Sequence, residues 1–190
     1  MLILKTVLIE TPIHNAGVQI DESLFSRISE DDKEAFLTLY EKCSSPVFLY
    51  ALSILRNRED AEDAMQDTFL KIRSAAHLYK PQGKPLAWIL TITKNICLMT
   101  FRKRAHSTDQ SINENFEDMG FDLIENINDR LVLEKAFTVI PGDVCRIIIL
   151  HAVGGMKHRE IAELLELPLS TVLSKYNRGI KKLRAEMERL

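Results

Sequence analysis

One C-terminal segment carries hydroxyl and cationic side chains at a spacing that suits nucleic-acid chemistry. From Pro168 to Arg184 there are five Lys or Arg residues and no acid. At the 3.6-residue period of a helix, apolar side chains from Val172 to Met187 gather on one side, and the hydroxyls and cations lie opposite. Groups near the start of such a helix reach base edges, and those farther along neutralise phosphates. The candidates for bases are Ser170, Thr171, Ser174 and Lys175, and those for phosphates are Arg178, Lys181 and Lys182.

The surrounding elements form a helix-turn-helix pattern. His158–Leu165 has the apolar spacing of a short helix, Glu166–Pro168 is a tight turn, and a longer helix is expected from about Leu169 to Glu188. A charged helix face is often only a solvated surface. The preceding helix, the turn and the absence of acids favour DNA binding instead. Gly179 is unfavourable inside a helix, and its place beside the apolar side predicts close packing there.

A second candidate surface is acidic. Ala61, Met65, Phe69 and Ile72 repeat at the spacing of a buried helical stripe. The opposite side of that helix carries Glu59, Asp60, Asp63, Gln66 and Asp67, together with Leu70. Such a face suits a protein partner with a basic surface. On spacing alone, an ordinary solvated helix face explains the pattern better.

A third candidate surface lies on the segment Leu86–Arg104, which is apolar on most sides and is expected to be the central helix of its domain. Its polar exceptions include Lys94, Asn95 and the basic residues from Arg102 onward. With Tyr79, Trp88 and the loop before the helix, they can form a platform for single-stranded nucleic acid, which combines cations with rings. Core packing is the competing explanation for Trp88.

Short sequence signals place the remaining elements. Before the loop Lys80–Pro85, we expect helices at Asp31–Tyr50, broken at Pro46, and at Asn57–Ile72, with Asn57 as the N-cap. In the C-terminal part, helices are expected near Asp129–Val139 and from about Asp143 to Val153, separated by Pro141-Gly142 and ended by Gly154-Gly155.

The composition supports an all-α protein. The chain has 190 residues, of which 46% are hydrophobic, 27% charged and only 7% aromatic, with 7 Gly and 6 Pro. So few turn residues argue against a sandwich or barrel. The 3 Cys lie far apart and the 5 His show no ligand spacing, so neither a metal nor another cofactor is expected. No segment has the length of a membrane span or the pattern of a signal peptide, so we expect a cytoplasmic protein without direct membrane insertion.

Charge divides the chain into domains. The net charge of −2 conceals two basic blocks, Lys84–His106 and Pro168–Arg184, separated by the acidic stretch Ser107–Asp129. We expect two small helical domains joined by a flexible acidic linker, the second a four-helix helix-turn-helix domain. The predicted divisions are an N-terminal extension of unknown role at 1–20, a first domain at 21–105, a linker at 106–127 and a second domain at 128–190.

Together these segments resemble the bacterial extracytoplasmic-function (ECF) class of RNA polymerase sigma factors, within the sigma-70 family. DAEDAMQDTFLKI resembles the core-polymerase-binding helix of that family, and PLAWILTITKNICLMTFRKR resembles its promoter-melting helix. HREIAELLELPLSTVLSKYNRGIKKLR resembles the helix-turn-helix of its second domain. The resemblance covers about residues 30–105 and 128–188.

The resemblance implies a role for each candidate surface. Residues matching the polymerase-clamp motif are Asp60, Glu62, Asp63, Gln66, Asp67 and Phe69. Those expected at the minus-ten element, where single strands are captured, are Tyr79, Lys84, Trp88, Lys94, Asn95 and Arg102. The helix-turn-helix residues named above are expected at the duplex minus-thirty-five element. The implied partners are core RNA polymerase, promoter DNA and an anti-sigma factor, and the protein itself is expected not to be an enzyme.

The sequence departs from the family pattern at two places, and two other functions share some of its features. Leu173 stands where many members carry Arg or Lys, and Lys157 and His158 stand where a Ser or Thr cap is usual. A repressor or activator with a sensing domain would also use a helix-turn-helix, usually as a dimer, but no long heptad seam is present. A polymerase-bound adaptor that touches no DNA would not need the basic face.

Overall fold

The computed structural model describes residues 18–106, 134 and 136–189, and the regular structure in these ranges is helical throughout. The chain divides into two compact units, one containing residues 18–106 and the other containing 134 and 136–189. The predicted all-α fold with two helical domains is therefore confirmed. The expected linker and N-terminal extension lie outside the described residues, except at 18–20 and 106. Within the described part, no helix is long and apolar enough to cross a membrane.

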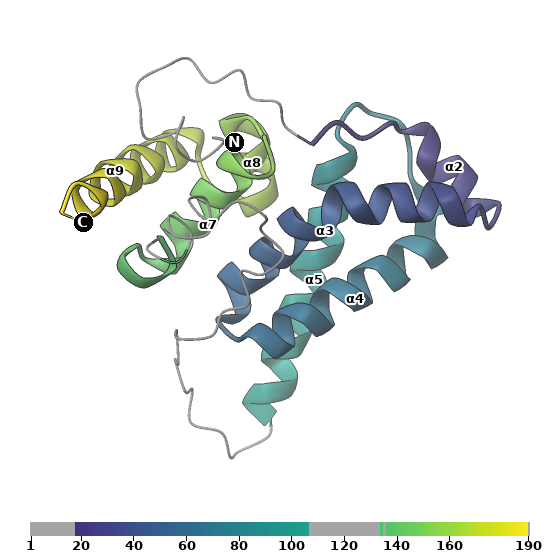
Figure 1. Cartoon of the computed structure of the whole chain (residues 1–190), viewed down its shortest axis with the longest axis horizontal. Coiled ribbons are helices and arrows are strands. Elements are labelled where there is room, and N and C mark those ends of the chain that lie inside the picture. The colour runs from purple at the N-terminus through teal and green to yellow at the C-terminus, as the bar shows by residue number, and fades with distance from the viewer. Residues whose placement is uncertain (1–17, 107–133, 135, 190) are drawn as a thin grey trace. The chain divides into compact units, whose positions relative to one another are not determined.

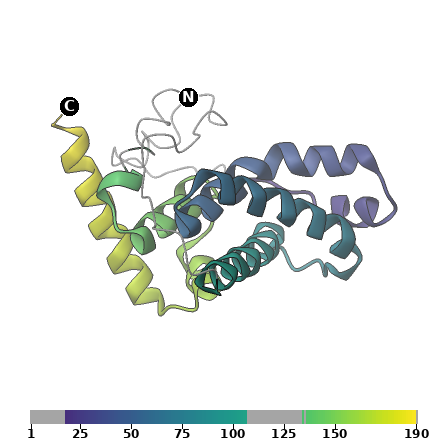
Figure 2. The same cartoon turned by 90° about the horizontal axis from the view of Figure 1, so that it is seen from below.

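Three long helices build the first unit. They are α3 (Lys33–Leu55), α4 (Arg58–Ala75) and α5 (Pro85–His106), and each packs against the other two. The short helix α2 (Ser23–Ser29) packs on α3, as Figures 1 and 2 show, and also on the 3-10 turn η1 (Ala76–Leu78). The sequence signals did not locate α2.

Helix α4 forms where its sequence predicts. The Asn57 side chain accepts a hydrogen bond from the Asp60 backbone N–H at 2.9 Å, which satisfies one of the free donors at the helix start. The expected stripe from Ala61 to Ile72 is buried, and so is Thr68, whose hydroxyl donates to the Ala64 carbonyl at 2.7 Å. One face of α4 is thereby fixed in the core, and the acidic face points outward.

The predicted break of the first long helix at Pro46 is wrong. Helix α3 runs without interruption from Lys33 to Leu55, with Pro46 inside it. An interior proline costs a helix about 3 kcal/mol, whereas each large apolar side chain that is buried contributes about 1.5–3 kcal/mol. The residues from Val47 to Leu52 after the proline are almost completely buried, so packing outweighs the local cost.

The second unit contains helical residues 136–139, α7 (Gly142–Ala152), α8 (His158–Leu165) and α9 (Leu169–Met187). These three named helices pack on one another, and α8 coincides with the predicted short helix. Glu166 ends α8 in the left-handed conformation, with φ 57°, and the Leu167 N–H donates to the Ala162 carbonyl at 3.0 Å. This is the hydrogen bond of a Schellman motif, and it turns the chain tightly into α9.

At the start of α8, a glutamate side chain takes the place of the usual Ser or Thr cap. Neither Lys157 nor His158 supplies a capping oxygen. Instead the Glu160 carboxylate accepts from the Lys157 backbone N–H at 2.8 Å. This is one half of a capping box, and it shows why the family's usual Ser or Thr is not required here.

Candidate nucleic-acid and protein interfaces

The acidic face of α4 is exposed from Asp63 onward. Asp63, Gln66 and Asp67 are exposed, and Leu70 beside them is 64% exposed. Asp60 and Glu62 are half-buried near the helix start, where Arg58 pairs with Glu62 at 2.8 Å. The face therefore offers carboxylates and one large apolar side chain, a combination suited to a basic protein surface with an apolar centre.

Phe69 does not belong to this face. Its side chain is 3% exposed and its ring lies 4.7 Å from the Tyr40 ring and 6.2 Å from the Phe36 ring. Its expected direct contact with polymerase is therefore corrected, because an aromatic side chain buried between α3 and α4 cannot touch a partner. Phe69 instead fixes the orientation of α4.

The rings of Tyr79 and Trp88 lie together, as a stacking platform requires, but both also pack against a buried ring of α2. Phe25 of α2, 1% exposed, stacks on Tyr79 at 4.0 Å and meets Trp88 edge-on at 5.3 Å. Tyr79 and Trp88 are themselves 5.3 Å apart and half-buried. The cluster therefore has both a core role and a partly exposed surface. Phe25 was missed because α2 gives no clear periodic signal.

Glu22 positions the loop beside these rings. Its carboxylate accepts a hydrogen bond from the Gly83 N–H at 2.7 Å, and Gly83 has φ +71°, a conformation that glycine adopts without strain. Burial, followed by the neighbouring Glu22 carboxylate, raises the pKa of Tyr79 to about 12, so the phenol stays protonated. No local sequence signal identifies Glu22, since 61 residues separate it from Gly83.

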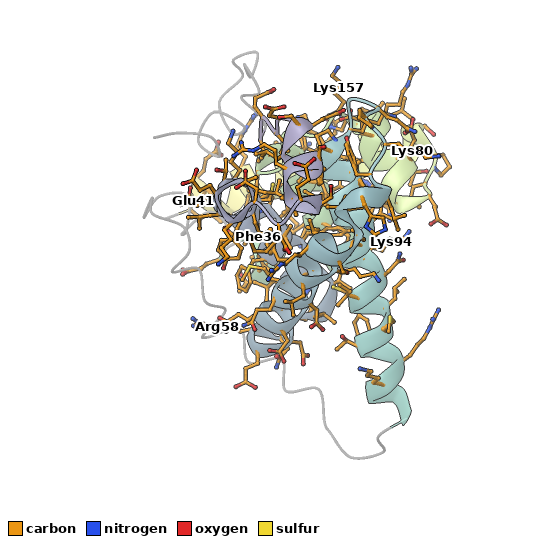
Figure 3. All side chains as sticks on the ribbon, turned by 90° about the vertical axis from the view of Figure 1, so that its right-hand side faces the viewer. Phe36, Glu41, Arg58, Lys80, Lys94 and Lys157 are labelled. Atoms are coloured by element: carbon orange, nitrogen blue, oxygen red, sulfur yellow. The ribbon has the colours of Figure 1, made fainter. Side chains whose placement is uncertain are left out.

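The remaining candidates for single-stranded DNA lie on the loop and along α5. Lys84, Asn95 and Arg102 are exposed and Lys94 is half-buried. Figure 3 places Arg58, at the start of α4, at the opposite end of the unit from Lys80 of the loop. The loop surface is thus well separated from the start of the acidic face.

On α9 the predicted division into a buried and an exposed side is observed. Val172, Gly179 and Leu183 are buried, while Tyr176, Ile180 and Met187 are half-buried. Of the predicted DNA-facing residues, Thr171 and Lys175 are half-buried and the others are exposed: Ser170, Ser174, Arg178, Lys181 and Lys182. Five of the seven candidates therefore share one open face.

The side chain of Lys175 is bonded to another residue of the same unit. Its ammonium group donates a hydrogen bond to the carboxylate of Asp143 in the first turn of α7, and its side chain is only 23% exposed. Lys175 lowers the pKa of Asp143, mainly through this hydrogen bond. Asp143 was not among the predicted site residues, because 32 residues separate it from Lys175.

The described residues contain no cluster of three or more His, Cys, Asp or Glu side chains that could hold a metal ion. The three cysteines are buried and unbridged, and burial raises the pKa of Cys43 to about 12, which keeps that thiol protonated.

The fold and these surfaces define a helix-turn-helix protein with a second, separate helical domain. The family model described as "Sigma-70 region 2" matches residues 39–107, and the one described as "Sigma-70, region 4" matches residues 131–183. Both regions thus occur in one chain, in this order. The chain belongs to the ECF class of the sigma-70 family of sigma factors, and its function is promoter-specific initiation of transcription.

Two curated relatives illustrate this membership. The ECF sigma factor SigE of Mycolicibacterium smegmatis is 29% identical over 145 residues, which cover 73% of this chain and 56% of that protein. The chain thus matches little more than half the length of this relative. The ECF sigma factor SigX of Bacillus subtilis is 23% identical over 168 residues, covering 83% of this chain and 86% of that protein.

Two solved structures share the fold. CnrH, in complex with the cytosolic domain of CnrY, has a TM-score of 0.59 and 21% identity, covering 89% of this chain and 97% of that one. The sigma factor RpoE of Bartonella quintana, in complex with the anti-sigma factor NepR, has a TM-score of 0.59 and 18% identity, covering 82% and 98%.

Proposed function

We propose that the three surfaces divide the work of a sigma factor among them. The acidic face of α4, formed by Asp63, Gln66, Asp67 and Leu70 with Asp60 and Glu62 at its start, binds the clamp of core RNA polymerase. The loop before α5 and the exposed polar side of α5 capture the minus-ten strand. The exposed face of α9 reads the minus-thirty-five duplex.

The observation that carries this proposal is the open face of α9 behind a complete helix-turn-helix. Its serines lie in the first turns and its cations farther along, in the order in which a recognition helix meets bases and then phosphates. A repressor would also use such a helix. The region 2 match in the same chain favours a sigma factor.

The protein supplies recognition, and the polymerase supplies the chemistry. We place its action in the cytoplasm, with polymerase, and assign it no catalytic activity of its own. An anti-sigma factor is a further expected partner, since the solved relatives CnrH and RpoE are seen with CnrY and NepR. If the purified chain initiates transcription, but the chain purified together with a cellular partner does not, that partner is an anti-sigma factor.

The test is to add the purified chain to bacterial core RNA polymerase and sequence the transcripts made from fragmented genomic DNA. New discrete 5′ ends that share two upstream elements are expected. Duplex DNA binding without initiation would contradict the polymerase role and favour a repressor or activator.

A further inference from the structure

Lys175 differs from the other cations on α9. Arg178, Lys181 and Lys182 are exposed, whereas the Lys175 side chain keeps 23% of its exposure and its ammonium is bonded to Asp143. A base-reading lysine in a free protein should be open to solvent. This one is already engaged by a carboxylate of its own domain.

The pair lies on the flank of α9 that packs on α7. Gly179, one turn further along, is buried against Val144 and Ile148 of α7, and Asp143 precedes Val144 directly. Ser174, the neighbour of Lys175, is exposed, because successive residues on a helix point about 100° apart. Lys175 therefore points toward α7 and away from the centre of the open face.

We propose that Asp143 is a specificity-determining residue of the recognition helix: it holds Lys175 against α7 and cancels its charge, so that Lys175 reads no base. This inference deepens the proposed function, because it rests on α9 facing promoter DNA. Asp143 is then a positioning residue, because it acts through Lys175. The first turns of α9 present only neutral groups to the DNA.

The engagement of Lys175 by Asp143 limits which bases the first turns of α9 can read. A free lysine in the major groove binds the O6 and N7 atoms of guanine. With Lys175 withheld, the exposed groups are the hydroxyls of Ser170 and Ser174 and the side chains of Leu169 and Leu173, which are 37% and 40% exposed. An apolar side chain there contacts the methyl group of thymine. The duplex element opposite this part of α9 is therefore expected to favour thymine over guanine.

The charge cancellation does not require the hydrogen bond to persist on DNA, whereas keeping Lys175 away from the bases does. Ion pairs near a protein surface contribute little to stability, and phosphates compete for the ammonium group. The carboxylate still remains beside it and opposes the added attraction, so the pair as a whole releases no counterion. Charge cancellation is therefore the property to measure.

The experiment compares Asp143→Asn, Lys175→Met and the double variant in the full chain. The salt dependence of duplex binding is measured for the chain alone, and base preference is read with core polymerase from a promoter library randomised in its upstream element. Lys181→Met is the matched control, since Lys181 is an exposed lysine on the same helix. Thermal unfolding of each variant identifies any loss of fold.

We expect Lys175→Met to leave both the salt slope and the base preference unchanged. Lys181→Met should make the slope shallower by about 0.9, the value for one phosphate. Asp143→Asn should steepen it by about the same amount and add guanine at one position, and the double variant should remove both effects. A change of preferred base in Lys175→Met would overturn the proposal, as would an Asp143→Asn variant that matches the wild type in both measurements. Absence of initiation by the wild type would instead contradict the proposed function, and the salt slopes would still decide whether Lys175 is neutralised.

Discussion

Gly179 of α9 lies so close to Val144 of α7 that a Cβ on the glycine would be 2.5 Å from the Val144 Cγ1 atom and 2.8 Å from the Ile148 Cδ1 atom. Glycine inside a helix costs about 1 kcal/mol relative to alanine. The close approach of the two helices explains why the residue is nevertheless used. The same contact fixes the distance of the recognition helix from the rest of its domain.

Gly179→Ala is therefore expected to destabilise the second unit. The helix gains about 1 kcal/mol of propensity, but a methyl group forced into a packed core costs about 1–3 kcal/mol, and Val144 is too stiff to move aside cheaply. A net loss of up to about 2 kcal/mol should appear as a lower midpoint of chemical unfolding, followed by circular dichroism. Asn177→Ala, at an exposed position two residues earlier, should not destabilise. Equal stability of the two variants would show that the helices can separate freely.

The pair His151 and His158 predicts acid sensitivity. Their rings are stacked, with centroids 4.3 Å apart. The Tyr176 ring lies nearly perpendicular to both, with its centroid 5.0 Å from that of His151 and 4.6 Å from that of His158. Burial, and secondarily the neighbouring His151, lower the pKa of His158. The Nε2 atom of His158 has no hydrogen-bond partner among the described residues, so a proton there would be unsupported.

The direction of the effect follows from linkage. A histidine whose pKa is lower in the folded than in the unfolded state binds protons more readily when the protein is unfolded. The free energy of unfolding therefore decreases as the pH falls. The stability of the second unit should be full above about pH 6.5 and decline below it. His158→Gln should flatten this decline in unfolding midpoints measured from about pH 7 to about pH 5. The control is His77→Gln, at an exposed histidine of the first unit, which should leave the decline of the second unit unchanged. An unchanged decline in His158→Gln would assign the acid sensitivity to other groups.

The helix-turn-helix was predictable because its signals are local. The apolar spacing of His158–Leu165 and the Leu-Pro turn lie within a few residues of one another, and the buried side of α9 follows directly from its period. The Asn57 cap was likewise correct, since it depends on one helix alone. The packing at Gly179 was correct because the glycine lies beside the apolar side of α9, although its partner on α7 could not be named.

What the sequence could not show depends on distant partners. The bonds from Glu22 to Gly83 and from Lys175 to Asp143 join residues 61 and 32 positions apart. The burial of Phe69 against Tyr40 was visible as part of a core stripe, but the motif resemblance placed the same residue at an interface. Pro46 was misjudged because its local cost is plain in the sequence, whereas the packing that offsets it is not.

Loss of the α4 cap should weaken the first unit. Asn57→Ala removes the oxygen that accepts from the Asp60 N–H, and such changes cost about 1 kcal/mol. Trp88, the only tryptophan of the chain, lies in this unit, so its fluorescence can follow urea unfolding. Asn57→Asp keeps an acceptor and should retain most of the stability. If Asn57→Ala unfolded at the wild-type midpoint, water would be replacing the cap without loss.

Charge reversal on α4 should separate polymerase binding from folding. Asp63→Lys with Asp67→Lys changes two exposed carboxylates, so the unfolding midpoint should hardly change, while affinity for core polymerase should fall at least tenfold, which is about 1.4 kcal/mol. Glu30→Lys with Glu41→Lys alters the net charge equally at exposed sites outside this face. Binding is measured by titrating labelled chain with core enzyme. Equal losses in both double variants would indicate a general charge effect, and no loss in either would remove the clamp from this face.

Arg178 tests the phosphate-binding part of α9. Its side chain is exposed one turn beyond Ser174, whose carbonyl accepts from the Arg178 Nε–H at 3.3 Å, so its remaining donors can reach a DNA backbone. Arg178→Ala should weaken binding to all duplex sequences alike and make the salt slope shallower by about 0.9, because one fewer counterion is released. Fluorescence anisotropy over a range of salt concentrations measures both quantities, with Lys71→Ala, an exposed lysine of the first unit, as the control. A loss confined to one promoter sequence with an unchanged slope would mean that Arg178 reads a base, since only base contacts discriminate among sequences in this way.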